Sequence, residues 1–460
     1  MTELPPGPLL AFYGDDFTGS TAAMEVMAFA GLSSVMFLDV PTPQRLARFA
    51  DRRCIGIAGI ARSRSPDWMN AALPPIYAAL ARLGAPLVHY KVCSTFDSAP
   101  HIGSIGRAVD LGAATFPARW IPLVVGAPAL ARYQAFGTLF AGMGGAAYRL
   151  DRHPVMASHP VTPMDEADIT RHLARQTVRR IGLIDVAALK RGEGDARRAM
   201  LAGDDAPVVA IDVLDDETLA LAGELIWHHR GEGRFVAGSQ GVEYALVAHW
   251  RASGLIPEAP AAMTLPSVER IAVVSGSCSP VTARQIAHAE QNGFAAIRIE
   301  VNRATDPASW EAEIGRVASL GLAALGTGAS PIAYTARGPD DPAIAALAEA
   351  CRSAGAAPSD VNDRIGAGLG SLLGQILDGS HLRRAVIAGG DTSGHATLGL
   401  GIDALSAAAA LAPGAPLCRA HAERPDRDGL ELALKGGQIG ADDYFSAARH
   451  GGALAPAWRG

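Results

Sequence analysis

Short apolar runs alternate along this chain with segments whose apolar residues recur at helical spacing, and most runs end in glycine, serine or acidic residues. In the first half the runs occupy residues 9–14, 53–60, 86–93 and 120–125. Uninterrupted apolar runs of this length are typical of strands that are buried on both faces of a sheet. The segment 20–30, between the first two runs, is typical of a helix. This alternation predicts an α/β fold in which a mostly parallel sheet is flanked by helices.

The second half repeats the alternation after a stretch of different composition. Residues 251–268 are rich in proline and alanine and lack periodicity, so we expect a linker there. Beyond it we expect strands near 271–275, 294–300, 321–326, 384–388 and 416–421, and helices near 340–353 and 360–378. The sequence therefore predicts two α/β domains, residues 1–250 and 269–460.

Composition and charge exclude several classes of protein. The 460 residues carry a formal net charge of -6 and are 49% hydrophobic and 19% charged, which is not the balance of a basic nucleic-acid binder. The amino terminus lacks the basic and apolar regions of a signal peptide, and no apolar run reaches the ~20 residues of a membrane span. The five cysteines form no C-x-x-C pair, so we expect reduced thiols. We predict a cytoplasmic protein that binds neither nucleic acid nor membrane.

Polar side chains follow three of the predicted strands in the first half. The three sets are Asp15 and Asp16, Arg62 and Arg64, and Lys91, Thr95 and Asp97. Parallel strands end at one edge of a sheet, where open α/β sheets bind ligands, so these residues predict a site for a small polar substrate. A carboxylate there could orient or deprotonate a hydroxyl group, and arginine suits a carboxylate or phosphate. The alternatives are that Asp16 or Thr18 caps a helix and that the arginines are solvated loop residues.

Two further turns lie in the second half, each between an apolar strand and a helix-like segment. They are Gly276-Ser-Cys-Ser279 and Gly389-Gly-Asp-Thr392. Backbone N–H groups of such a turn, together with the helix dipole, favour phosphate groups, and Asp391 could hold a metal ion beside them. Two phosphate-type turns in one half indicate a nucleotide.

Lysine is rare in this chain and occurs only at positions 91, 190 and 435, although lysine and arginine together number 40. A lysine ammonium is a compact point charge that arginine does not replace at a binding site. Lys91 and Lys435 lie in motif-like segments, so we expect a function for both, with chance retention as the alternative. The sequence has no G-x-x-x-x-G-K-[ST] or H-E-x-x-H motif, and we interpret the glycines of 366–374 as helix packing.

Taken together, six motifs in this order along the chain resemble the four-carbon acid sugar kinase family. They are Gly14-Asp-Asp-Phe-Thr-Gly19, Lys91-Val-Cys-Ser-Thr-Phe-Asp-Ser98, His159-Pro-Val-Thr-Pro-Met164, Gly276-Ser-Cys-Ser-Pro-Val-Thr282, Gly389-Gly-Asp-Thr-Ser-Gly394 and Leu434-Lys-Gly-Gly-Gln-Ile-Gly440. The resemblance implies an amino-terminal domain for a sugar acid, a carboxyl-terminal domain for ATP, and an active site in the cleft between them. It implies transfer of the terminal phosphoryl group of ATP to a substrate hydroxyl, with Mg²⁺ offsetting charge.

The same resemblance implies roles for individual residues. Asp15, Asp16, Arg62, Lys91, Thr95 and Asp97 would face the sugar acid, with Asp16 as the base, and Arg64 joins this set from its place beside Arg62. Ser277, Ser279, Gly389, Gly390, Asp391, Thr392 and Gly437 would face ATP, with Asp391 at the metal.

Two segments depart from the pattern of tetronate-specific members, at residues 126–138 and 238–243. They favour the branch of the family that acts on 3-oxo-isoapionate, with 3-oxo-tetronate, threonate or erythronate as alternative substrates. From other classes we keep a non-catalytic sensor of sugar acid and nucleotide, and a hydrolase with Cys278 as nucleophile. A homo-oligomer is left open.

Overall fold

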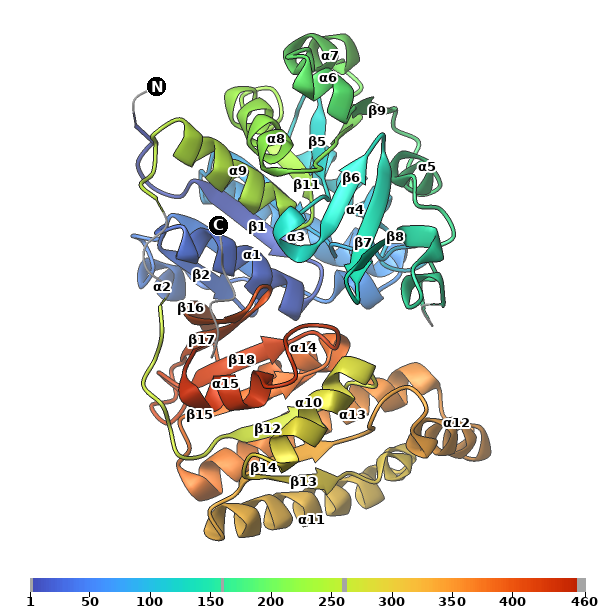
Figure 1. The fold of residues 1–460 in the computed structure, drawn as a ribbon, viewed down its shortest axis with the longest axis vertical. Helices are drawn as coiled ribbons and strands as arrows, with labels where there is room; N and C mark the ends of the chain where they lie inside the picture. The colour runs from blue at the N-terminus through green and yellow to red at the C-terminus, as the bar shows by residue number, and fades with distance from the viewer. Residues whose placement is uncertain (1–2, 159–160, 259–262, 453–460) are drawn as a thin grey trace. The chain divides into compact units, whose positions relative to one another are not determined.

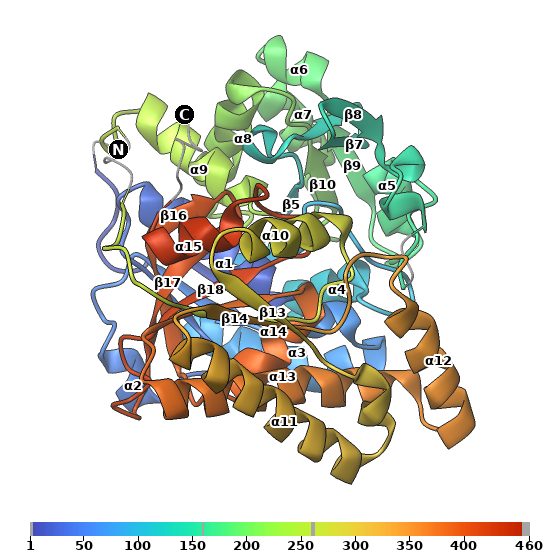
Figure 2. The same cartoon turned by 60° about the horizontal axis from the view of Figure 1, so that its bottom comes forward.

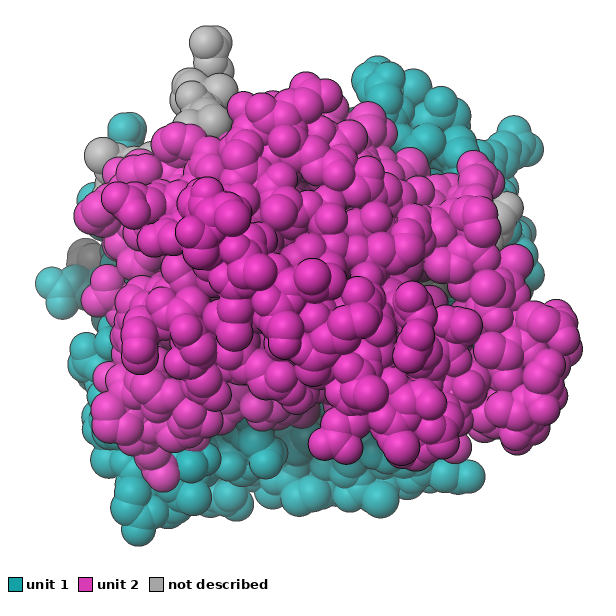
Figure 3. Space-filling view, turned by 90° about the horizontal axis from the view of Figure 1, so that it is seen from below, with its two compact units in different colours: residues 1–260 teal, residues 261–460 magenta. Residues whose placement is uncertain are grey.

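The computed structural model describes residues 3–158, 161–258 and 263–452. It divides the chain into two compact units, residues 1–260 and 261–460, which Figure 3 draws in teal and magenta. Each unit contains a mostly parallel sheet flanked by helices (Figure 1), so the predicted fold class is confirmed. Among the residues described, none of the helices has the length and apolar character that crossing a membrane requires.

The sheet of the first unit has the strand order β2-β3-β1-β4-β11-β5-β10-β9, and all neighbours are parallel. The strands are β1 (Leu10–Gly14), β2 (Ser34–Phe37), β3 (Cys54–Ala58), β4 (Leu87–Lys91), β5 (Ile121–Val124), β9 (Ile181–Ile184), β10 (Val208–Ile211) and β11 (Phe235–Gly238). The four apolar runs of the first half are therefore strands β3, β1, β4 and β5, slightly shorter than predicted. Gly14 lies opposite Ala58 on one side and Lys91 on the other, so three strands end level.

Helices cover this sheet because each buries an apolar stripe against it. In α3, for example, the buried residues Met69, Leu73, Tyr77 and Leu80 recur every three or four positions. The helices are α1 (Phe17–Phe29), α2 (Pro43–Ala47), α3 (Pro66–Arg82), α4 (Ile105–Thr115), α5 (Ile169–Ala174), α6 (Val186–Lys190), α7 (Gly194–Leu201), α8 (Asp216–His228) and α9 (Gly241–Ala252). Short 3-10 helices are η1 (Ala61–Ser63), η2 (Pro128–Leu130), η3 (Leu150–Arg152) and η4 (Met156–Ser158).

A three-stranded antiparallel sheet of β6 (Arg132–Ala135), β7 (Thr138–Met143) and β8 (Ala146–Arg149) forms a separate layer of this unit. One buried carboxylate, Asp212, anchors it. Asp212 accepts hydrogen bonds from the backbone N–H groups of Phe136, Gly137 and Val186 and from the Gln134 side chain. Since Asp212 follows β10 directly, it fastens the β6–β7 turn to the end of the main sheet.

The sheet of the second unit has the order β13-β14-β12-β15-β18-β17-β16. Its strands are β12 (Ala272–Ser275), β13 (Phe294–Arg298), β14 (Ser330–Tyr334), β15 (Arg384–Ala388), β16 (Ala404–Ala412), β17 (Ala415–His421) and β18 (Glu431–Lys435). β17 runs antiparallel to both of its neighbours, and the other pairs are parallel. The helices are α10 (Pro280–Glu290), η5 (Val301–Thr305), α11 (Pro307–Gly326), α12 (Pro342–Ala354), α13 (Pro358–Ser380), α14 (Gly390–Leu398) and α15 (Tyr444–His450). α11 and α13 run side by side (Figures 1 and 2).

One predicted strand of this unit is wrong. Residues 321–326 are the last turns of α11, and the strand that follows is Ser330–Tyr334. The segment Gly-Leu-Ala-Ala-Leu-Gly continues the helical spacing of α11, and alanine and leucine are strong helix formers, so a short apolar run was mistaken for a strand. The glycines of 366–374 lie inside α13, where Gly368 and Gly370 approach Trp310 and Ala396 closely, which confirms helix packing.

Candidate active site

The level ends of β3, β1 and β4 bring three loops of the first unit together. The backbone N–H of Asp15, after β1, donates to the carbonyl oxygen of Lys91 at 2.9 Å. The N–H of Arg62, in the loop after β3, donates to the carbonyl oxygen of Asp15 at 3.0 Å. These two bonds explain why residues far apart in sequence form one cluster.

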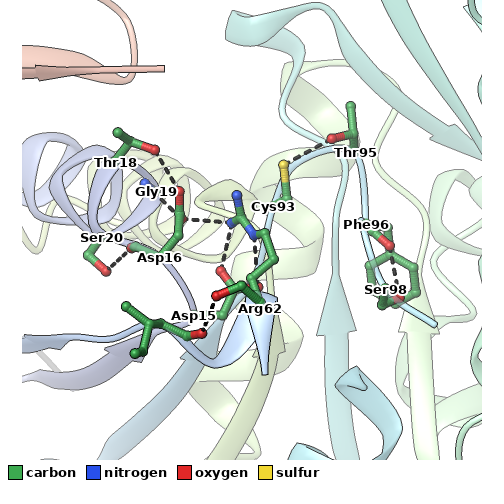
Figure 4. A network of polar contacts seen from close by, with 12 residues as sticks. Asp15, Asp16, Thr18, Gly19, Ser20, Arg62, Cys93, Thr95, Phe96 and Ser98 are labelled. Carbon is green, nitrogen blue, oxygen red and sulfur yellow. Dashed lines mark hydrogen bonds and ion pairs between the residues drawn. The ribbon is translucent and has the colours of Figure 1, made fainter. Parts of the chain in front are cut away.

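Arg62 points toward both aspartates of the first loop (Figure 4). Its Nη2 lies 2.7 Å from Asp15 Oδ1 and 2.7 Å from Asp16 Oδ1, and its Nε lies 3.3 Å from Asp15 Oδ2. Asp15 and Asp16 are only 1% and 5% exposed. A buried carboxylate pair requires a counter-charge, and Arg62 supplies it to both.

Asp16 also begins helix α1, as the alternative interpretation of this residue held. Its Oδ1 accepts from the Gly19 N–H at 2.9 Å, and its Oδ2 accepts from the Thr18 hydroxyl at 2.6 Å. Capping fixes the carboxylate at the positive end of the helix dipole. Capping does not exclude a catalytic role, because it holds a charged group at the edge where ligands bind.

The two aspartates have opposite pKa shifts. Burial raises the pKa of Asp15, and although Arg62 offsets part of this, the adjacent Asp16 charge adds to the rise. Burial would also raise the pKa of Asp16, but the charges of Arg62 and Lys91 outweigh it. A hydrogen bond from Thr18 lowers the pKa of Asp16 further. These interactions favour the ionised form of Asp16, which is the form that orients or deprotonates a hydroxyl group.

Lys91 closes the cluster from the end of β4. It is 1% exposed, and its position beside α1 is defined by Gly19, where an added Cβ would lie 2.5 Å from Lys91 Nζ and 2.3 Å from Asp16 Oδ1. A side chain at position 19 would displace the ammonium or the carboxylate, because together they fill the space beside the glycine.

The loop after β4 carries the remaining predicted residues of this unit. Cys93 Sγ lies 2.9 Å from Thr95 Oγ1, and Phe96 has a left-handed φ of 56°. Asp97 is 8% exposed, and its Oδ1 is buried without a hydrogen-bond partner. Ser98 donates to the Phe96 carbonyl at 3.0 Å and so stabilises the turn. The loop places Cys93 between Arg62 and Thr95 (Figure 4).

Other predicted residues of the first unit are placed as follows. Arg64 ends η1, and its carbonyl oxygen accepts from the Gly103 N–H at 2.9 Å. Of the motif 159–164, His159 and Pro160 lie outside the described residues, while Thr162 and Met164 are buried. Helix α5 begins at Ile169, where Asp168 caps it by accepting from the N–H groups of Thr170 and Arg171.

In the second unit, the loops after β12, β15 and β18 lie side by side. The Gly276 N–H donates to the Ala388 carbonyl at 2.9 Å, and the Gly389 N–H donates to the Lys435 carbonyl at 2.8 Å. Gly389 has a φ of 126°, a conformation that only glycine adopts readily. A Cβ added at Gly390, the first residue of α14, would meet no described atom within 4 Å. The start of the helix therefore has open space beside Gly390, where a ligand could approach the backbone.

The first and third of these loops touch directly. Thr282 Oγ1 lies 3.0 Å from Ser277 Oγ and 3.1 Å from the Gly437 carbonyl oxygen, and Ser279 caps α10. A Cβ at Gly437 would lie 2.8 Å from Ser277 Oγ and 3.1 Å from Ser279 Cβ. The side chains of Asp391 and Thr392 lie outside the described part of the structure. Within the described residues no group of three metal-ligating side chains occurs.

Lys435 is completely buried behind these loops. Its Nζ donates to Gly436 O at 2.8 Å, Thr282 Oγ1 at 3.2 Å and Gly437 O at 3.3 Å. Burial lowers the pKa of Lys435 to about 7. Among the residues whose side chains are described, only neutral oxygens accept hydrogen bonds from Lys435, and a polyphosphate would add negative charge beside it.

Cys278 lies between the two serines and is exposed. The surrounding protein raises its pKa by desolvation, and Asp341 adds to the rise. A thiol with a raised pKa is a poor nucleophile at neutral pH, so the geometry gives no support to the hydrolase alternative.

Sequence reasoning missed the importance of Gly19 and Arg132. Gly19 belongs to the first motif, but only the close approach of Lys91 explains why a glycine occupies this position. Arg132 is half-buried at the start of β6, and no signal in the sequence distinguishes it from the other arginines. The rarity of lysine drew attention to Lys435, which is buried beside the three loops.

The chain matches known proteins over its whole length. A family model described as a sugar-binding N-terminal domain matches residues 10–246, and one described as a nucleotide-binding C-terminal domain matches residues 272–445. The chain is 54% identical to the 3-oxo-isoapionate kinase of Paraburkholderia graminis, over 98% of this chain and 96% of that protein. It is 30% identical to the 3-oxo-tetronate kinase of Cupriavidus necator, over 96% of each.

Solved structures share this fold. One described as a putative tRNA synthase from Salmonella typhimurium LT2 matches with a TM-score of 0.74 and 25% identity, over 96% of this chain and 98% of that one. A Haemophilus influenzae protein matches with a TM-score of 0.67 and 24% identity, over 95% of this chain and 99% of that one.

Proposed function

Because this chain belongs to the four-carbon acid sugar kinase family, we propose that it phosphorylates a hydroxyl group of 3-oxo-isoapionate with ATP. The assignment of the substrate rests on the 54% identity to a 3-oxo-isoapionate kinase over 450 residues, compared with 30% identity to a 3-oxo-tetronate kinase. The two clusters at the strand ends support the activity, since one presents paired carboxylates and the other presents a glycine turn at the start of a helix with open space beside Gly390.

In the first unit we assign Asp16 to the reacting hydroxyl group. The hydroxyl oxygen attacks the terminal phosphorus of ATP, its proton passes to the Asp16 carboxylate, and ADP leaves. Asp15 keeps Arg62 in place, and Lys91 offsets negative charge beside the nucleophile. Phosphoryl transfer depends on positioning and charge neutralisation more than on covalent chemistry, which suits a cluster this rigid.

In the second unit we assign the triphosphate to the three adjoining loops. The open glycine turn at the start of α14 and the buried amine of Lys435 fit a polyanion. The residues assigned are Ser277, Ser279, Gly389, Gly390, Thr392 and Gly437. We assign Asp391 to Mg²⁺, which would offset the negative charge of the phosphates, since this ion needs only one or two protein carboxylates.

Release of ADP with a panel of acids tests the activity and the substrate. The panel contains 3-oxo-isoapionate, 3-oxo-tetronate, D- and L-threonate and erythronate, each with ATP and Mg²⁺. We expect 3-oxo-isoapionate to give the highest kcat/KM. A higher kcat/KM with another acid would overturn the assignment of the substrate. Absence of ADP release with every acid would favour the alternative of a non-catalytic sensor. Cys278→Ser should retain activity.

Lys435 predicts that ATP binding takes up protons. With a pKa of about 7, the amine is largely neutral near pH 8, and a nearby triphosphate would raise this pKa, so a proton binds together with ATP. Calorimetric titration near pH 8 in buffers of different ionisation enthalpy measures this uptake. Lys435→Met should remove it. Lys190→Met, at a surface lysine paired with Asp215, should not. Equal uptake by wild type and Lys435→Met would contradict the assignment.

A further inference from the structure

Within the described residues, Arg132 makes hydrogen bonds through only one nitrogen of its guanidinium group. It stands at the start of β6, where its Nη1 donates to the carbonyl oxygens of Leu130, Ala131 and Gly142 at 3.0, 3.3 and 3.4 Å. Its Nε is buried without a hydrogen-bond partner, and the described residues give its Nη2 no partner either. A buried donor without an acceptor destabilises the protein, so a ligand that supplies an acceptor here is favoured.

The uncommitted Nε and Nη2 form the edge with which other arginines of this chain bind carboxylates. Arg180 uses this edge on Asp205, at 2.6 and 2.8 Å. Arg191 uses it on Glu193, at 2.8 and 2.9 Å. The two parallel N–H groups match the two oxygens of one carboxylate. The free edge of Arg132 therefore has the geometry of a carboxylate receptor.

Asp97 and Cys93 lie close enough to Arg132 to affect its charge. Burial lowers the pKa of Arg132, and Cys93 and Asp97 partly offset this. Nevertheless, no ion pair joins Arg132 to Asp97 in the part of the chain that is described, and Asp97 Oδ1 also lacks a partner. The Arg132 Nε–H donor and the Asp97 Oδ1 acceptor, both buried without a partner, are complementary to a ligand that carries both a carboxylate and a hydroxyl group.

Cys93 links this pair to the Asp16 cluster. The pKa of Cys93 is raised to about 11 by burial and by Asp97, while Arg62 lowers it and Asp16 raises it. The thiol is thus within electrostatic reach of both groups, and Figure 4 shows it between Arg62 and Thr95. A small acid held between Arg132 and Asp97 would lie beside the carboxylate assigned to its reacting hydroxyl.

We propose that Arg132 binds the carboxylate of the sugar acid through Nε and Nη2, and that Asp97 accepts a hydrogen bond from one of its hydroxyl groups. This inference rests on the proposed function and adds the residues that select the substrate. The Nε and Nη2 atoms of Arg62, which form the same edge, already bind Asp15 and Asp16. The acid end of the substrate is then recognised by the small antiparallel sheet, which Asp212 fixes to the main one.

The test compares 3-oxo-isoapionate with its primary amide, which lacks the negative charge. Wild type should prefer the acid, and Arg132→Met should lower kcat/KM for the acid about a hundredfold, because removing one partner of a buried charged pair has effects of this order. The ratio of kcat/KM between acid and amide should approach one, with KM for ATP unchanged. Arg132→Lys, with a point charge but no fork, should give an intermediate ratio.

Two further variants separate recognition from folding. Asp97→Asn should lower kcat/KM for both compounds and keep their ratio, because it alters a hydroxyl contact. Arg149→Met removes an exposed arginine of the same small sheet and should change neither value. Addition of the acid should raise the melting temperature of wild type and not that of Arg132→Met.

The outcomes distinguish this inference from the proposed function. Wild type without activity on any acid would overturn the proposed function. If the wild type is active and Arg132→Met keeps the wild-type ratio of kcat/KM between acid and amide, only the role of Arg132 is overturned. If Arg132→Met does not fold, the ratio measured for Arg132→Lys decides, and a wild-type ratio there overturns the proposal.

Discussion

Asp16→Asn is expected to lower kcat by about 10²–10⁴-fold, the usual contribution of a positioned acid–base group. Asparagine keeps the side-chain oxygen that caps α1, since it is as good a cap as aspartate. Arg62 also keeps Asp15 as its partner. The variant thus removes the negative charge beside the hydroxyl group and little else. Steady-state ADP release gives kcat, and circular dichroism melting checks the fold.

Asp67→Asn is the matched control, because Asp67 is exposed in the first turn of α3 and should not alter turnover. The pH dependence gives a second check. The pKa of Asp16 lies below its ordinary value, so kcat/KM should be constant through the acidic side of neutrality and fall only when pH drops below the usual range of an aspartate. A kcat for Asp16→Asn within tenfold of wild type would exclude this residue as the base.

Gly19→Ala should lower kcat/KM by about a hundredfold or more, although alanine is the better helix former. The added methyl group would lie 2.3 Å from Asp16 Oδ1 and 2.5 Å from Lys91 Nζ, so both charged groups must move. Misplacement of catalytic groups by about 1 Å costs rates of this order. Kinetics with the acid and a melting curve measure the two effects separately.

Gly315→Ala provides the control for helix propensity. Gly315 lies inside α11, and an added Cβ there would meet nothing within 4 Å. This variant should be slightly more stable than wild type, by roughly 0.5–1 kcal/mol, and equally active. If Gly19→Ala were as active as Gly315→Ala, the close packing of Asp16 against Lys91 would not matter for function.

The strands and the site loops were predictable because they depend on local patterns. Continuous apolar runs that end in polar turns identified β1, β3, β4, β12 and β15, and the rule that parallel strands end together placed Asp15, Arg62 and Lys91 at one edge. The error at 321–326 arose because Leu and Ala in a short run fit a helix as well as a strand.

The remaining features depend on contacts across long distances in the sequence. Nothing local indicates that Asp212 would gather four N–H donors and fasten the β6–β7 turn. Likewise, Arg62 and Arg132 have the same side chain. Only the fold brings the carboxylate-binding edge of Arg62 onto Asp15 and Asp16 and leaves the edge of Arg132 without a partner among the described residues. The pKa of Lys435 follows from its burial, which no sequence pattern expresses.

The position of β11 in the first sheet has a consequence for how the protein is made. β11 lies between β4 and β5 and pairs Gly238 with Lys91, so the middle of the sheet receives one of its last strands. A ribosome releases β4 long before β11, and until then β4 has an open edge that can pair with another nascent chain. A premature stop between residues 92 and 234 should therefore yield aggregates, and chaperone demand should peak while this interval is translated.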